Sequence, residues 1–70
     1  MERFGKRDLT PREMQMASLV ARGLTNKEIA AEMGLSFLYA KRLVSIVLDK
    51  TGMGNRVELA IWYAAKYPKL

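Results

Sequence analysis

Apolar residues recur at helical spacing along most of this chain, in four segments separated by short polar or glycine-containing breaks. The pattern predicts helices from Pro11 to about Arg22, from Asn26 to Met33, over about residues 36–50, and from Asn55 to about Lys66. No segment shows the two-residue alternation of a half-buried strand. We therefore expect an all-α fold of four helices.

Two of these helices begin with the same local motif. Thr10, Pro11 and Glu13 belong to the run T-P-R-E, which combines a capping box with proline at the first helical position. Thr25 and Glu28, in the run L-T-N-K-E, repeat the box. Since such boxes satisfy the free N–H groups of a helix start, they fix where both helices begin.

The junction between the second and third helices has the pattern of a helix-turn-helix. Gly34 is suited to the left-handed turn, and the small Ala30 lets the helices approach closely. The apolar positions that would hold the two helices together are Ile29, Met33, Leu35, Ala40 and Leu43. Ordinary helical hairpins also show this pattern, so it favours nucleic-acid binding without requiring it.

The composition narrows the possible functions. The 70 residues form one small domain, which we divide into a flexible basic arm at residues 1–8 and a folded part at residues 9–70. The chain has no Cys and no His, which excludes disulfides, zinc fingers and the corresponding catalytic groups and is compatible with the cytoplasm. No apolar run is long enough for a membrane span. The net charge of +5 favours an anionic partner, with nucleic acid foremost.

Catalysis is not expected. The seven acidic residues are spread over caps and surfaces, and neither a glycine-rich phosphate loop nor a cluster of metal ligands is present in the sequence. We expect no enzyme activity and no cofactor.

The third helix has two different faces when it is placed at 3.6 residues per turn. One stripe is apolar or small and faces inward: Ala40, Val44, Val47 and Thr51. The opposite stripe carries Lys41, Arg42 and Ser45 and is extended by Leu38 and Asp49. Cationic side chains on one helix suit the guanine acceptors of a DNA major groove, although such a face can also be merely solvated.

The start of the second helix is a candidate phosphate site. Thr25, Asn26 and Lys27 combine outward N–H groups with a full positive charge. Thr25 is also simply a cap. Arg56, at the start of the fourth helix, can reach either a phosphate or an acidic neighbour.

Beyond these patterns, residues 9–36, LTPREMQMASLVARGLTNKEIAAEMGLS, closely resemble the start of the LuxR-type (GerE-type) DNA-binding domain. Residues 51–60, TGMGNRVELA, are similar to its later glycine, N-R pair and last helix. The resemblance implies a bacterial transcriptional regulator that binds double-stranded DNA sequence-specifically with its third helix, residues 36–50, in the major groove. It also implies base contacts by the positions of Lys41, Arg42 and Ser45, a backbone contact by Lys27, and pairing of two copies through the last helix.

One segment departs from that family. Phe37, Leu38 and Tyr39 stand, with Ala40, where the family usually has a small or acidic pair followed by T-V. These large side chains can contact thymine methyl groups, or they can form a protein-binding patch. The alternative function is therefore a module of the same fold that binds or antagonises another transcription regulator.

The fourth helix is apolar on two faces. We expect one stripe to dock on the core: Val57, Ala60, Ile61 and Ala64. The other, Leu59, Trp62 and Tyr63, is then left for a homodimer interface, since large exposed apolar patches mark interaction sites. The alternative is that Trp62 folds into the core of its own chain.

Overall fold

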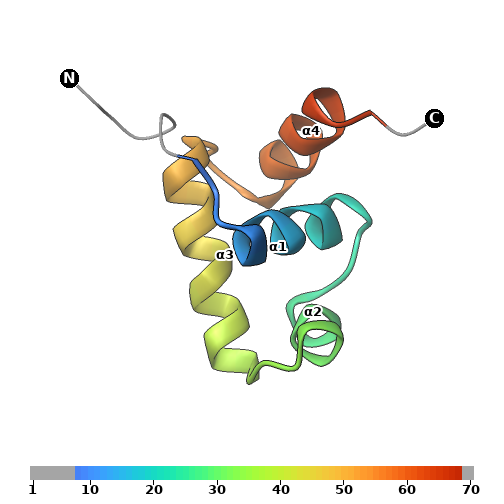
Figure 1. The fold of residues 1–70 in the computed structure, drawn as a ribbon, viewed down its shortest axis with the longest axis vertical. Helices are drawn as coiled ribbons and strands as arrows, with labels where there is room; N and C mark the ends of the chain where they lie inside the picture. Colours follow the sequence, from blue (N-terminus) through green and yellow to red (C-terminus); the bar gives the residue numbers. More distant parts are fainter. Residues whose placement is uncertain (1–7, 69–70) are drawn as a thin grey trace.

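The four predicted helices are present in the structure, a computed structural model that describes residues 8–68. They are α1 (Pro11–Ala21), α2 (Asn26–Met33), α3 (Phe37–Thr51) and α4 (Arg56–Lys66) (Figure 1). Within the described residues the chain forms no strand, so the all-α prediction is confirmed. All but Asp8 of the proposed N-terminal arm, residues 1–8, lies outside the described residues.

Both predicted capping boxes form. In the first, the Thr10 N–H donates to Glu13 Oε1 at 2.9 Å and the Glu13 N–H donates to Thr10 Oγ1 at 3.1 Å. In the second, the matching distances between Thr25 and Glu28 are 2.8 and 3.2 Å. The helix starts are therefore determined by a few residues in sequence, which is why the pattern predicted them correctly.

Helix α1 is the central element of the fold, because it contacts each of the other three helices. Figure 1 shows it between the long α3 on one side and α4 on the other, with α2 below. The core is formed by apolar residues of all four helices: Met16, Ala17, Leu19, Val20, Ile29, Ala30, Ala40, Leu43, Val44, Val47 and Leu59. This core fixes α3 against α1 and α2 and leaves its opposite side to solvent.

The turn between α2 and α3 is the predicted one. Gly34 has φ 69°, a left-handed conformation that side chains with a Cβ adopt at a cost. The Leu35 N–H donates to Ala30 O at 2.8 Å and so closes the end of α2. The helix-turn-helix is thus formed by α2, this turn and α3.

A mostly buried ion pair joins the start of α1 to the end of α3. Lys50 Nζ donates to both carboxylate oxygens of Glu13, at 2.8 and 3.1 Å. Burial by itself would raise the pKa of Glu13, but hydrogen bonds from Lys50 and Thr10 and the charge of Lys50 outweigh it and lower the pKa below its ordinary value. The folded protein therefore holds Glu13 ionised more firmly than the unfolded chain does.

This ion pair predicts a specific acid sensitivity. Because the pKa of Glu13 is lower in the folded state, its charge stabilises the fold above the ordinary glutamate pKa of about 4.3, and this contribution disappears as the pH falls through the lower folded value. Glu13→Gln keeps an amide oxygen for the capping box but loses the charge, so we expect a loss of about 1.5–3 kcal/mol at neutral pH. Urea denaturation followed by circular dichroism between pH 7 and pH 3 measures both effects.

The matched control is Glu28→Gln. Glu28 has the same place in the second capping box, but its hydrogen bonds are exposed and involve only Thr25. We expect a change of less than about 0.5 kcal/mol. Equal losses in the two variants would show that the pair with Lys50 contributes nothing of its own.

Candidate functional site

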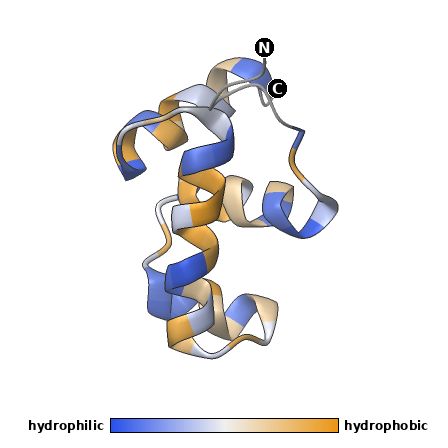
Figure 2. Cartoon of the chain, turned by 90° about the vertical axis from the view of Figure 1, so that its left-hand side faces the viewer, coloured by the Kyte–Doolittle hydropathy of each residue, from blue (hydrophilic) through white to orange (hydrophobic). Residues whose placement is uncertain are grey.

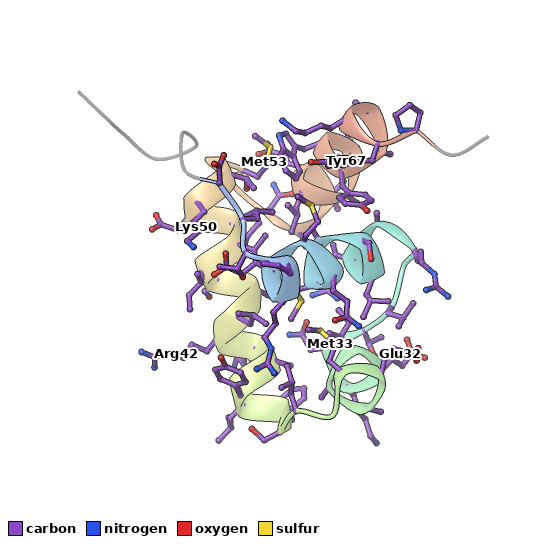
Figure 3. All side chains as sticks on the ribbon, in the orientation of Figure 1. Glu32, Met33, Arg42, Lys50, Met53 and Tyr67 are labelled. Atoms are coloured by element: carbon purple, nitrogen blue, oxygen red, sulfur yellow. The ribbon has the colours of Figure 1, made fainter. Side chains whose placement is uncertain are left out.

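The outer face of α3 carries the predicted cationic residues. Lys41, Arg42 and Ser45 are all exposed, whereas Ala40, Leu43, Val44, Val47 and Thr51 are buried against the other helices. Arg42 points away from the body of the molecule (Figure 3). The division into an inner and an outer face is therefore as predicted, and base contact by the outer residues stays a prediction.

The first turn of α3 is apolar and lies on the surface. Ser36 caps the helix by accepting the Tyr39 N–H at 3.1 Å. The side chains that follow are 50% exposed at Phe37, 74% at Leu38 and 40% at Tyr39. Viewed from the side of α3, the helix shows hydrophilic and hydrophobic residues together along its length (Figure 2). None of the three large side chains belongs to the buried core.

The start of α2 retains the features of an anion site. Thr25 is the N-cap, and the exposed Lys27 lies in the first turn. The first N–H groups of a helix have no acceptor within the helix, so those of Asn26 and Lys27 are directed outward. This geometry suits a phosphate, and contact with one by Thr25, Asn26 or Lys27 stays a prediction.

Arg56 has a structural role that the sequence did not reveal. Its guanidinium donates to Asn26 Oδ1 at 2.5 Å and to the Leu24 carbonyl oxygen at 2.5 Å. Neither acceptor is the acidic residue that the sequence suggested: one is a side-chain amide oxygen and the other is a backbone carbonyl oxygen. Arg56 ties the first residue of α4 to the start of α2, while its own phosphate contact stays a prediction. These partners are 30 and 32 positions away in sequence, so no local pattern could indicate them.

The prediction for the two faces of α4 was wrong. Leu59, assigned to the dimer interface, is completely buried, and Trp62 and Tyr63 are half-buried against the same core. In the stripe predicted to dock, Ala60 packs against the core as expected, but Val57 is 67% and Ile61 64% exposed. Both stripes have helical spacing, so the pattern does not choose between them. The larger side chains cover more apolar surface when they face the core, and they do so here.

The reversal leaves a different apolar surface on α4. Val57, Ile61 and Ala64 are exposed at spacings of four and three, so they lie on one side of the helix. We call these three residues the outer α4 face. Lys66 Nζ lies 5.6 Å from the centre of the Trp62 ring and partly covers that half-buried side chain. The outer α4 face is therefore the most exposed apolar surface of this helix, and contact between two copies through Trp62 or Tyr63 stays a prediction.

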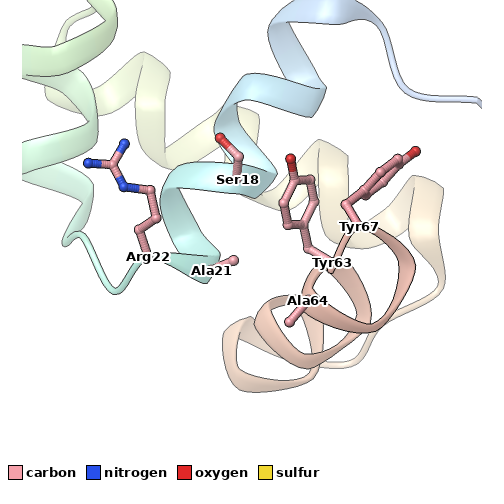
Figure 4. Close-up of a pocket in the computed structure, with 6 residues that line it drawn as sticks. All are labelled: Ser18, Ala21, Arg22, Tyr63, Ala64 and Tyr67. Atoms are coloured by element: carbon pink, nitrogen blue, oxygen red, sulfur yellow. The ribbon is translucent and has the colours of Figure 1, made fainter. Parts of the chain in front are cut away.

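A shallow pocket of about 410 Å³ lies between the C-terminal ends of α1 and α4 (Figure 4). It is lined by Ser18, Ala21, Arg22, Tyr63, Ala64 and Tyr67. The two tyrosine rings pack 4.9 Å apart, and the Ser18 hydroxyl donates to Gln15 O at 2.8 Å. The lining contains no carboxylate.

The helix-turn-helix fold with its exposed α3 agrees with the family that sequence comparison identifies. The profile of the GerE family, described as bacterial regulatory proteins of the luxR family, matches residues 7–63. The chain belongs to this family, and the resemblance found in the sequence is confirmed.

Individual relatives agree with this assignment. The chain is 46% identical over 54 residues to the response regulator Rre1 of Synechocystis, 77% of this chain and 23% of that protein. It is 47% identical over 58 residues to the two-component response regulator PprB of Pseudomonas aeruginosa, covering 83% and 20%. Over 57 residues it is 47% identical to the transcriptional regulatory protein UhpA of Salmonella typhimurium, covering 80% and 29%. The chain thus spans only about a quarter of the length of these relatives.

None of the helices within residues 8–68 is both long and apolar enough to cross a membrane.

The observed orientation of α4 predicts unequal effects for two apolar residues of similar size. Leu59→Ala opens a cavity in the core, so we expect a loss of about 2–5 kcal/mol, enough to unfold much of so small a domain. Ile61→Ala removes a side chain that is mostly in solvent, and we expect less than about 0.5 kcal/mol. Thermal melts of both variants at a low protein concentration make the comparison. A larger loss for Ile61→Ala would restore the orientation first inferred from the sequence.

Proposed function

We propose that this chain is a sequence-specific DNA-binding domain of a bacterial transcriptional regulator, with α3 lying in the major groove of double-stranded DNA. The observation that carries the proposal is the exposed group of Lys41, Arg42 and Ser45 on the outer side of α3. This helix is the second of a helix-turn-helix in a member of the luxR family. A major groove admits one such helix, and its guanine edges accept hydrogen bonds from lysine and arginine.

Two groups of residues have different roles in the recognition of DNA. Lys41, Arg42 and Ser45 contact base edges and provide sequence discrimination. Thr25, Asn26 and Lys27, with Arg56 beside them, contact the phosphate backbone and provide much of the affinity. The arrangement is supported by the exposed Lys27 and by the outward N–H groups at the start of α2. In this function the protein needs no catalytic group and no cofactor, and it works in the cytoplasm, where bacterial DNA lies.

A protein-binding module of the same fold is less well supported. Its one favourable observation is the exposed apolar turn Phe37–Tyr39. Against it stand the cationic face on the same helix and the relatives, whose names describe response regulators and a transcriptional regulatory protein. We therefore retain DNA as the partner of α3.

The domain binds DNA as a homodimer, and the outer α4 face forms the contact between copies. Val57 and Ile61 are large apolar side chains with most of their surface in solvent, and Ala64 extends the same side. Such a patch marks an interaction site. Two copies joined through α4 can present their recognition helices to half-sites about 34 Å apart, one turn of DNA.

The division between base and phosphate contacts predicts different mutant behaviour. Lys41→Ala and Arg42→Ala should each weaken binding to selected DNA by about 1–3 kcal/mol while changing binding to random DNA much less. Lys27→Ala should weaken both alike and reduce the slope of log affinity against log salt concentration by about 0.9. Fluorescence anisotropy titrations at several salt concentrations measure these quantities. The division fails if the three variants respond identically on selected and random DNA, and the DNA function fails if the unaltered protein does not bind at low salt.

If the domain dimerises through α4, one substitution in this helix should weaken binding only to DNA that carries two half-sites. Ile61→Asn makes the outer α4 face polar without changing charge, so it should abolish self-association and weaken binding to DNA with two half-sites by at least about tenfold. Binding to a single half-site should stay the same. Gln15→Asn, at an exposed position of α1, is the matched control and should change neither. Sedimentation equilibrium reports the association state, and equal binding of the Ile61 variant and the unaltered protein to the paired site would remove α4 from the interface.

A further inference from the structure

The most exposed large apolar side chain of the described residues lies on the proposed DNA-facing side of α3. Leu38 is 74% exposed, more than any other residue of its kind in that part of the chain. It precedes Lys41 by three residues, Arg42 by four and Ser45 by seven. At 3.6 residues per turn, these spacings put all four side chains on one face of the helix, with Leu38 at its N-terminal end.

The distribution of charge on this face indicates which half of α3 enters the groove. Continuing the face toward the C-terminus leads to the exposed Asp49. The N-terminal turns carry Lys41 and Arg42 and no acidic residue, so in the proposed complex they would be the part that enters the groove most deeply. Leu38 is then close to the floor of the groove.

The floor of a major groove offers one apolar group to such a side chain, the C5-methyl of thymine. Guanine, cytosine and adenine have no methyl group there, and Leu38 can satisfy none of their hydrogen-bonding groups. Packing a leucine on the methyl removes apolar surface of both groups from water.

We propose that Leu38 is a specificity-determining residue that recognises a thymine by its C5-methyl group, next to the bases read by Lys41 and Arg42. Phe37 and Tyr39 precede and follow it in the sequence and flank this contact on its two sides, where they exclude water. The inference rests on the proposed DNA function and adds a base preference to it. The apolar turn is thereby part of the DNA interface, continuous with the cationic face of the same helix.

Replacing thymine by uracil tests this directly, because uracil lacks only the C5-methyl. A half-site is first selected from random DNA, and each thymine in it is then replaced singly by deoxyuridine. Loss of one buried methyl should lower the affinity of the unaltered protein about fourfold at one or two positions. In Leu38→Ser the same probes should bind equally well with thymine or uracil. Since Leu38 is mostly in solvent, this variant should keep its helicity, which circular dichroism checks.

Lys41→Ala is the control that separates methyl recognition from general weakening. It should bind every probe less tightly but keep the fourfold preference for thymine. The inference is overturned if uracil changes the affinity of the unaltered protein at no position, or if Leu38→Ser retains the thymine preference. It is also overturned if Leu38→Ser binds all probes as the unaltered protein does, since the apolar turn would then lie outside the DNA interface. Each of these results leaves DNA binding itself intact, whereas failure of the unaltered protein to bind any DNA would refute the function beneath it.

Discussion

The position of α3 depends on the ion pair between Glu13 and Lys50 together with the apolar core that packs this helix against α1 and α2. Glu13 takes part in the capping of α1 and also accepts two hydrogen bonds from Lys50 in the last turn of α3. A carboxylate buried to this degree would be costly without a partner, so the start of α1 and the end of α3 are held together. Since α1 also contacts α2 and α4, the pair connects α3 to the body of the fold at the end remote from the helix-turn-helix junction.

With both of its ends held, α3 can present an exposed face in one fixed orientation. At its beginning, the left-handed Gly34 and the Ser36 cap set its direction relative to α2. Along its length, Ala40, Val44 and Val47 are packed into the core. The backbone positions of the exposed residues are therefore set before a partner binds, which reduces the entropy lost on binding.

Most of the fold could be predicted because its signals are local. The capping boxes at Thr10 and Thr25 involve residues three apart, and the turn at Gly34 depends on a single backbone conformation. The two faces of α3 followed from its periodicity for the same reason. Lys41, Arg42 and Ser45 were thus located correctly on the exposed side, although their contacts with bases are a matter for binding experiments.

What the sequence could not predict depends on contacts between distant segments. The ion pair joins residues 37 positions apart, and the Arg56 hydrogen bonds span 30 and 32 positions. The predicted orientation of α4 was wrong because both apolar stripes of this helix have the same periodicity. Only the packing of α4 against α1 shows that Leu59 is buried and Ile61 exposed. The apolar first turn of α3 was recognised as unusual, but its exposure required the positions of the neighbouring helices.

The hydrogen bonds of Arg56 have a mechanical consequence. Arg56 is the first residue of α4 and directly precedes Val57. Its guanidinium donates hydrogen bonds to Asn26 Oδ1 and to the Leu24 carbonyl oxygen at the start of α2. If α4 rotates when a second copy docks on it, the start of α2 must either move with it or give up these two bonds. The start of α4, next to its exposed apolar side, and the start of α2 are therefore linked directly by the Arg56 side chain, and these two bonds would oppose a movement of one helix relative to the other.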